Sequence, residues 1–135
     1  MSERPSALVT SGVVELAAAA LSGWAFTYAI SNPEGARRAG VASVPRIRQW
    51  HLDLVALGTS TVALGVAVPD APRIVQGSLA TGAWTNAMLF LPLAFKPELI
   101  DEPGYKAAAG ASFVATTVGF VGMAATAIAR RRAAR

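Results

Sequence analysis

The chain has 135 residues and is too apolar for an ordinary soluble domain. Hydrophobic residues make up 53% of it, charged residues only 15%, and the mean hydropathy is +0.45. The charges gather at the chain ends and between long apolar runs, which is typical of a protein that crosses a membrane several times. Because the chain contains no cysteine, disulfides, thiolate metal sites and covalent haem attachment are excluded.

The basic balance does not indicate nucleic-acid binding. The net charge is +4 and the pI is near 10.4, but the arginines flank apolar runs and form no stripe along a soluble face. We therefore expect membrane lipid around the chain, no nucleic acid as a partner, and a multi-pass location in the plasma (inner) membrane.

Four apolar segments predict four transmembrane helices in one domain, residues 1–135. The expected spans are 7–30, 46–68, 73–95 and 105–129. The first run is too long for a signal peptide and carries Glu15, so we interpret it as a retained helix. Because the connections are short, consecutive helices must be antiparallel neighbours. The sequence thus predicts an all-α, up-down-up-down membrane bundle.

Three ionisable side chains fall at membrane depth, namely Glu15, His51 and Asp53. Such groups are costly in hydrocarbon and carry a functional hypothesis by default. Glu15 is expected near the surface opposite to His51, so we expect a capping, proton-sharing or interhelical role for it. Asp53 should point to a different face of its helix from His51.

His51 is the single histidine of the chain. Imidazole ligates haem iron and also acts as an acid or base near neutral pH. One histidine without other good ligands cannot build a zinc or copper site, whereas a porphyrin supplies four ligands of its own iron. The simpler alternative is an interfacial histidine that hydrogen-bonds a loop carbonyl or a lipid headgroup.

Helical spacing places Val55 and Gly58 on the face of His51, with Arg48 one turn earlier. A glycine on an apolar stripe leaves room for a flat group beside the helix. Arg48, near the membrane surface, is suited to pair with a carboxylate such as a haem propionate. Snorkelling of Arg48 to lipid phosphate is the alternative.

Asn86 is an amide deep in the third span. Counting along the helical rise places His51 about 8 Å and Asn86 about 13 Å from the same surface, so we expect both to face one cavity. The alternative for Asn86 is an interhelical hydrogen bond that serves packing. Trp24 and Tyr28 lie at the level of His51 and are expected to wall the cavity or to anchor at the interface.

The pattern Arg48-x-x-His51-Leu52, with Gly58 seven residues after the histidine and Trp84-x-Asn86 in the third span, resembles a known family. It is similar to the small membrane isomerases typified by styrene oxide isomerase and hydroxylaminobenzene mutase, which the chain length and four-span layout also match. The resemblance implies a homotrimer with non-covalent haem b at each subunit interface. It further implies that His51 is the axial ligand and that Asn86 is the pocket asparagine.

The chemistry that the resemblance implies is Lewis-acid catalysis by ferric iron on the oxygen of a small aromatic substrate. An aryl epoxide would rearrange to an aldehyde, or an arylhydroxylamine to an aminophenol. The styrene oxide branch has a tyrosine where this chain has Phe90 and an acidic residue where it has Gly82, so we favour the mutase-like branch or a relative with another small aromatic substrate. The expected substrate pocket is Trp84, Phe90, Trp24 and Tyr28. The alternatives are a non-catalytic membrane subunit or small transport protein and a haem carrier or sensor.

Overall fold

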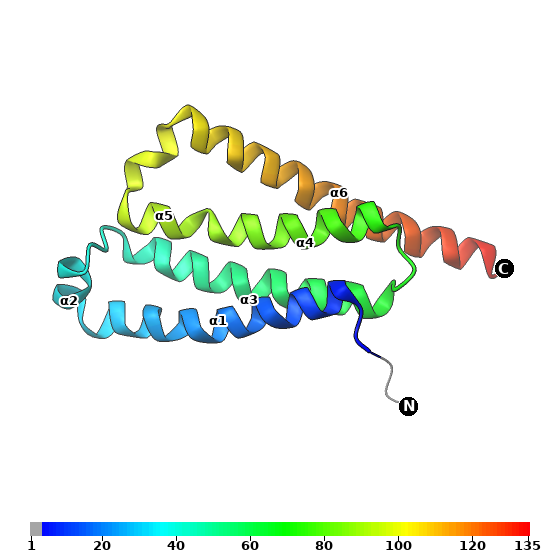
Figure 1. Cartoon of the computed structure of the whole chain (residues 1–135), viewed down its shortest axis with the longest axis horizontal. Helices are drawn as coiled ribbons and strands as arrows, with labels where there is room; N and C mark the ends of the chain where they lie inside the picture. Colours follow the sequence, from blue (N-terminus) through cyan, green and yellow to red (C-terminus); the bar gives the residue numbers. More distant parts are fainter. Residues whose placement is uncertain (1–3) are drawn as a thin grey trace.

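The computed structural model describes residues 4–135, and every regular element in that part is helical (Figure 1). The elements are α1 (Ala7–Ser31), α2 (Pro33–Arg38), α3 (Val44–Ala67), α4 (Arg73–Met88), α5 (Phe90–Phe95), the 3-10 helix η1 (Pro97–Asp101) and α6 (Pro103–Ala133). The all-α prediction is confirmed, and the expected spans coincide with α1, α3, α4 with α5, and α6.

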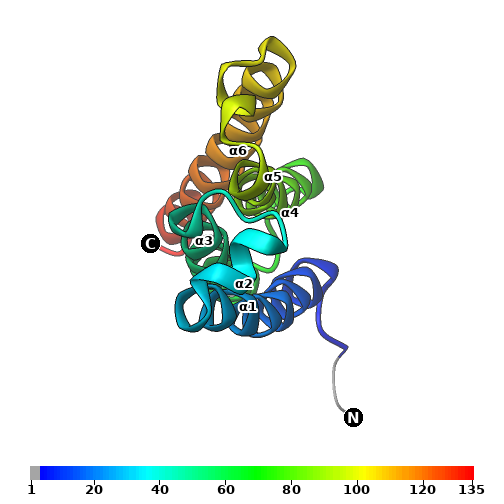
Figure 2. The ribbon, with the colours of Figure 1, turned by 90° about the vertical axis from the view of Figure 1, so that its left-hand side faces the viewer.

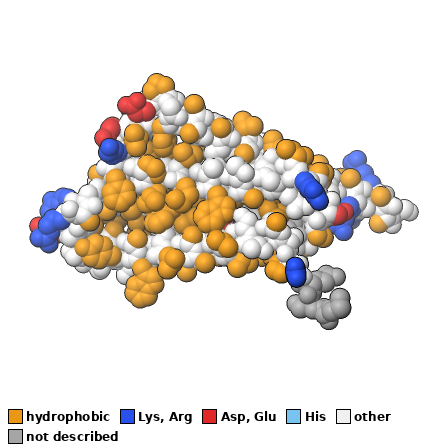
Figure 3. Space-filling view, viewed as in Figure 1, with side chains coloured by type: hydrophobic (Ala, Val, Ile, Leu, Met, Phe, Trp, Pro, Cys, Tyr) orange, Lys and Arg blue, Asp and Glu red, His pale blue; other side chains and the backbone are white. Residues whose placement is uncertain are grey.

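Within residues 4–135, three helices are long and apolar enough to cross a membrane: α1, α3 and α6. The 24 residues of α3 extend over about 36 Å, which exceeds the about 30 Å of a bilayer's hydrocarbon core. In Figure 3, hydrophobic side chains cover the middle of the visible face, and most of the charged ones lie towards its ends. These features indicate a multi-pass membrane protein.

The third apolar segment is a broken helix, whereas the sequence predicted one continuous span over 73–95. α4 ends at Met88 and α5 begins at Phe90, and the two follow one another along nearly the same line (Figure 1). Pro92 lacks the N–H group that would bond the carbonyl of Met88, which explains the interruption. The hydroxyl of Tyr105 donates to the carbonyl oxygen of Leu89, 2.7 Å away, at the break.

The long helices run alternately up and down, as expected, but they form a curved row instead of a closed bundle. α1 packs on α3, α3 on α4, and α4 on α6. The end-on view places α1 and α6 at opposite sides of the molecule (Figure 2). We call the two outer couples the α1–α3 pair and the α4–α6 pair.

Glycines bring the backbones of both pairs together. In the α1–α3 pair, a Cβ added at Gly12 would lie 3.0 Å from the carbonyl oxygen of Gly58. In the α4–α6 pair, a Cβ at Gly119 would lie 2.5 Å from the Cα of Leu79, and one at Gly82 would lie 2.5 Å from the backbone nitrogen of Thr116. Small residues at these crossings permit the close contact by which membrane helices associate.

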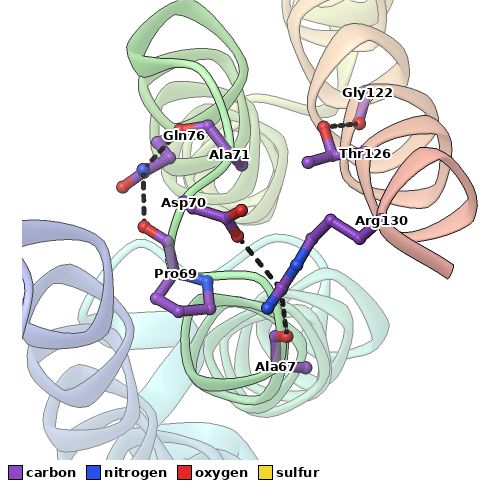
Figure 4. Close-up of polar contacts among 8 residues, drawn as sticks. All are labelled: Ala67, Pro69, Asp70, Ala71, Gln76, Gly122, Thr126 and Arg130. Atoms are coloured by element: carbon purple, nitrogen blue, oxygen red, sulfur yellow. Dashed lines mark hydrogen bonds and ion pairs between the residues drawn. The ribbon is translucent and has the colours of Figure 1, made fainter. Parts of the chain in front are cut away.

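The loop between α3 and α4 is tied to the far part of α6. Arg130 Nη1 lies 3.0 Å from Asp70 Oδ1 and donates to the carbonyl oxygen of Ala67 at 3.3 Å (Figure 4). Gln76 Nε2 donates to the carbonyl oxygen of Ala71 at 2.7 Å within the same loop region. The two Arg130 contacts fasten the C-terminal part of α6 to this loop.

Candidate functional site

The imidazole of His51 lies between α1 and α3. Its Nδ1 is 3.0 Å from the carbonyl oxygen of Ala19 and 2.9 Å from Ser22 Oγ. A carbonyl oxygen only accepts, so Nδ1 carries the proton that is shared with it. Ser22 Oγ donates its own proton to the same carbonyl at 2.7 Å and therefore accepts from Nδ1. In this tautomer Nε2 keeps its lone pair, and no hydrogen bond to Nε2 occurs within residues 4–135.

Two further residues of α1 fix the orientation of the His51 ring. Phe26 stacks on it with a centroid distance of 6.2 Å and an interplanar angle of 22°. A Cβ added at Gly23 would lie 3.2 Å from Cε1 and 3.9 Å from Nε2, so a larger residue there would crowd the ring. The imidazole is thus held on one side by polar contacts and lies beside a position without a side chain on the other.

A shallow groove of about 410 Å³ adjoins His51, and we call it the His51 groove. Its other lining residues all belong to α1 and are Ala20, Gly23, Trp24, Phe26 and Thr27. Ala20 and Thr27 are exposed, and Trp24 is 78% exposed. The groove therefore opens on the outer face of the α1–α3 pair, and a ligand larger than the groove is fully covered only by a second molecule.

The donor set of this groove fits haem better than a bare metal ion. Within the described part of the chain, no cluster of three or more metal-ligating side chains occurs, whereas haem iron needs only one or two protein ligands. A backbone carbonyl that accepts from the second ring nitrogen is the usual support of a metal-bound histidine. The small residues Ala20 and Gly23 leave space beside His51.

Two other residues expected at the cofactor lie on the surface of α3. Both Arg48 and Val55 are exposed, and the exposed fraction of Val55 is 39%. Arg48 forms no ion pair within residues 4–135, so its guanidinium is available to a propionate or to lipid phosphate. Neither side chain lines the His51 groove.

The expectation that Gly58 leaves room for a flat group is wrong. Gly58 is buried against α1, and a Cβ there would lie 3.2 Å from the carbonyl oxygen of Gly12 and 3.1 Å from the side chain of Leu16. α1 fills this space because the two helices cross closely at Gly12 and Gly58. The glycine beside His51 is instead Gly23, on the other helix, where a Cβ would lie 3.2 Å from Cε1 of the ring.

Asn86 does not share a cavity with His51 in one chain, which corrects a second expectation. Asn86 and Phe90 line a separate pocket of about 460 Å³, bounded by α4, α5, η1, the first turns of α6 and Arg46 of α3. We call this the Asn86 pocket. The two cavities have no lining residue in common. They are separate because α1 and α6, which provide much of their walls, lie at opposite sides of the molecule (Figure 2).

The four expected substrate-pocket residues are dispersed. Trp24 lines the His51 groove and Phe90 the Asn86 pocket, while Tyr28 lines a third depression. Trp84 donates from Nε1 to Ser11 Oγ at 3.1 Å and packs on the buried cluster that includes Ala19 and Leu54. Trp84 therefore links α4 to α1 and does not line either cavity.

Glu15 is completely buried between helices. A capping role was one of the options expected for it, but the N-cap of α1 is Ser6, whose Oγ accepts from Val9 N at 3.2 Å. Neither carboxyl oxygen of Glu15 has a hydrogen-bond partner among the described residues, nor has the buried hydroxyl of Thr61. A buried polar group without a partner is costly in an apolar environment. Asp53 accepts from Gln49 Nε2 at 2.7 Å, within α3.

The residues that hold His51 were missed by the sequence analysis. Ala19, Ser22, Gly23 and Phe26 recur at spacings of three, four and seven residues from Ala19, so they share one face of α1. That spacing was the available signal. It was not sufficient alone, because the partner of Ser22 lies 29 residues away on another helix.

Comparison with known proteins found no match of any kind. No family model matches the chain, no curated protein matches it, and no solved structure matches it. The resemblance to membrane haem isomerases therefore rests on Arg48, His51, Gly58, Trp84 and Asn86, and the function is a proposal built on these residues and on the geometry of the His51 groove.

Proposed function

We propose that this chain is a haem b-dependent isomerase or mutase of the plasma membrane, with α4 and α5 together forming its third span. The observation that carries the proposal is the presentation of His51. Its Nδ1 is committed to the carbonyl of Ala19, and its Nε2 is free beside an outward-facing groove. Haem iron, when bound, supplies a Lewis acid for the oxygen of a small aromatic substrate, an arylhydroxylamine or an aryl epoxide.

The protein's part in this proposal is to hold and orient the ligand nitrogen. Ala19 and Ser22 fix the tautomer of His51, and Phe26 restricts rotation of its ring. The hydrogen bond from Nδ1 to a carbonyl also makes Nε2 a better donor to a metal. Gly23 keeps the neighbouring space clear, and the apolar surroundings exclude water from a reactive intermediate.

Assembly is part of the proposal, because one chain does not bring His51 and Asn86 together. The His51 groove opens outward from the α1–α3 pair, and the Asn86 pocket lies on the α4–α6 side. In a ring of three identical chains, one chain's α1–α3 pair would meet the α4–α6 pair of the next, and such a head-to-tail contact closes on itself. We therefore propose a homotrimer in which Asn86, as the catalytic asparagine, and Trp24 of adjacent chains border one site.

The test is an absorption spectrum of the detergent-purified protein after expression with ample haem. The wild type is expected to show a Soret band, and His51→Ala is expected to lose it. Ser22→Ala is the control. It is expected to keep the Soret band, because the carbonyl of Ala19 still orients His51 in that variant. A wild-type protein without a Soret band overturns the proposal.

A turnover assay separates catalysis from simple haem binding. The haem-loaded protein is expected to convert an arylhydroxylamine to an aminophenol, or an aryl epoxide to an aldehyde, and Asn86→Ala is expected to slow this conversion. A Soret band with neither conversion would indicate a haem carrier or sensor.

One observation favours a second candidate, a non-catalytic membrane subunit. The hydrogen bonds of His51 to Ala19 and Ser22 link α3 to α1 and would serve packing without any ligand. In that case His51→Ala would lower the thermal stability of a colourless protein, and added haem would not raise the stability of the wild type. If added haem stabilises the wild type but not His51→Ala, the haem-binding candidate is supported and the structural one is excluded.

A further inference from the structure

The Asn86 pocket exists because the α4–α6 pair opens at one end. Gly82 and Gly119 hold the two helices in contact, and Thr85 Oγ1 meets Ser112 Oγ at 2.8 Å. Beyond that hydrogen bond α6 diverges from α5 (Figure 1). A Cβ added at Gly110 would have no atom within 4 Å, so the space between the helices is not filled there.

The size of the pocket suits a compact ligand. Its volume is about 460 Å³, within the range of small-molecule sites. The stretch of α6 from Pro103 to the Thr85–Ser112 hydrogen bond corresponds to about 14 Å of helical rise. Such a short cleft accommodates a ring system better than an extended acyl chain. Phe90 and Phe113 contribute aromatic rings to its lining.

The charged groups of the pocket are positive. Arg46 and Lys106 line it, and no acidic side chain does. Lys106 pairs with Asp101 at 3.6 Å, with both side chains largely exposed. Arg46 forms no ion pair within residues 4–135, and its guanidinium lies 5.7 Å from the ring centroid of Phe90. An unpaired guanidinium beside an apolar pocket attracts a carboxylate, which it binds through two parallel hydrogen bonds.

We propose that the Asn86 pocket binds a small aromatic carboxylate. Arg46, in the first turns of α3, pairs with the carboxylate, while Phe90 and Phe113 contact the ring. Asn86 lies deeper along α4, and its amide forms no hydrogen bond within the described residues, so it is free to bind a polar substituent on the ring. Within one chain the pocket shares no lining residue with the His51 groove, so carboxylate binding does not require haem, and in the proposed trimer the same pocket would border the haem site of the adjacent chain.

The test compares two ligands of one shape. Binding of 2-naphthoate and of the neutral 2-naphthamide is measured by equilibrium dialysis with the full chain in detergent, at low and at high salt. The wild type is expected to prefer the carboxylate, and Arg46→Gln to weaken its binding about tenfold or more, as expected for a charge-assisted hydrogen bond. Lys96→Gln, at the same end of the molecule but outside the lining, is the matched control and is expected to bind normally.

A second pair of variants tests the location. Gly110→Leu should fill the pocket and abolish binding while the fold persists, because nothing lies within 4 Å of the new Cβ. Gly77→Leu introduces the same side chain at an equally open helical position elsewhere and should leave binding unchanged. Helical content and gel-filtration volume, recorded for both variants, show that each is folded.

Three results would overturn the inference. Equal affinity for 2-naphthoate and 2-naphthamide would show that charge is not recognised. Unchanged binding in Arg46→Gln or in folded Gly110→Leu would place the ligand elsewhere. Displacement of 2-naphthoate by a long-chain fatty acid at much lower concentration would show that the pocket prefers a lipid chain.

Discussion

The α1–α3 pair and the α4–α6 pair both cross at glycines, but only the α4–α6 pair also opens beside a glycine at one end. Gly12 and Gly58 meet backbone atoms across the first pair, and Gly82 and Gly119 do so across the second. Gly110, also on α6, meets nothing within 4 Å. A glycine in a membrane helix thus marks either a tight crossing or an open space, and only the position of the partner helix decides which. The contrast can be tested by substitution.

The largest effect is expected from Gly119→Leu. A Cβ at this position would already lie 2.5 Å from the Cα of Leu79, and backbone cannot move aside as a flexible side chain can. We expect a loss of about 3 kcal/mol or more in the free energy of unfolding, at the upper end for overpacked sites. Thermal unfolding followed by circular dichroism measures this loss, with Gly110→Leu as the tolerated counterpart. Equal stability of the two variants would contradict the contrast.

Glu15→Met tests whether the buried carboxyl of α1 lowers the stability of the protein. The carboxyl oxygens of Glu15 are buried without partners, and an unsatisfied buried polar group costs about 1–3 kcal/mol. Replacement by an apolar side chain of similar length is therefore expected to raise stability by up to about that amount. Glu15→Gln, which keeps polar atoms at the same place, should change stability less. A destabilised Glu15→Met variant would mean that the carboxyl does have a partner.

His51→Ala tests how much the polar contacts add to the same pair. Removal of the imidazole eliminates its bonds to Ala19 and Ser22 and its stacking on Phe26. A loss of about 1–2 kcal/mol is expected from these contacts in the protein without ligand. Ser22→Ala, which removes one of the two bonds, should cost less. Chemical unfolding monitored by tryptophan fluorescence provides the measurement, and an unchanged midpoint for His51→Ala would refute the packing contribution.

The smallest effect is expected at the fastening of α6 to the loop after α3. Arg130 and Asp70 approach to 3.0 Å, but their side chains are 48% and 56% exposed. Exposed pairs contribute less than about 1 kcal/mol, and salt screens them. A double-mutant cycle with Arg130→Gln and Asp70→Asn should give a coupling of a few tenths of a kcal/mol, which declines with salt. A coupling that does not depend on salt would indicate a desolvated pair.

The helices themselves were predictable from the sequence, since length and hydropathy suffice to find apolar segments that match a membrane. The four expected ranges coincide with α1, with α3, with α4 followed by α5, and with α6. The break at Leu89 was missed, although Pro92 was a signal for it. Tyr105 donates to the carbonyl oxygen of Leu89 at the break, and such a contact from another helix is not visible in a hydropathy pattern.

The candidate site was predictable only in part. His51 was identified because a lone imidazole at membrane depth is conspicuous, but the rotation of each helix about its axis depends on all its neighbours. That rotation directs Gly58 towards α1 and directs Asn86 away from His51. Periodicity within one helix shows which residues share a face, and it does not show which helix that face meets.

α6 is held at both ends, by Arg130 and by Tyr105, and this has a consequence for the size of the Asn86 pocket. Arg130 anchors the helix at the terminal end, and the opening of the Asn86 pocket lies at the other end, between α5 and α6. Two of its lining residues, Tyr105 of α6 and Leu89, are joined by a hydrogen bond. That bond sets the width of the pocket at this end, and its loss would widen the pocket for larger ring systems.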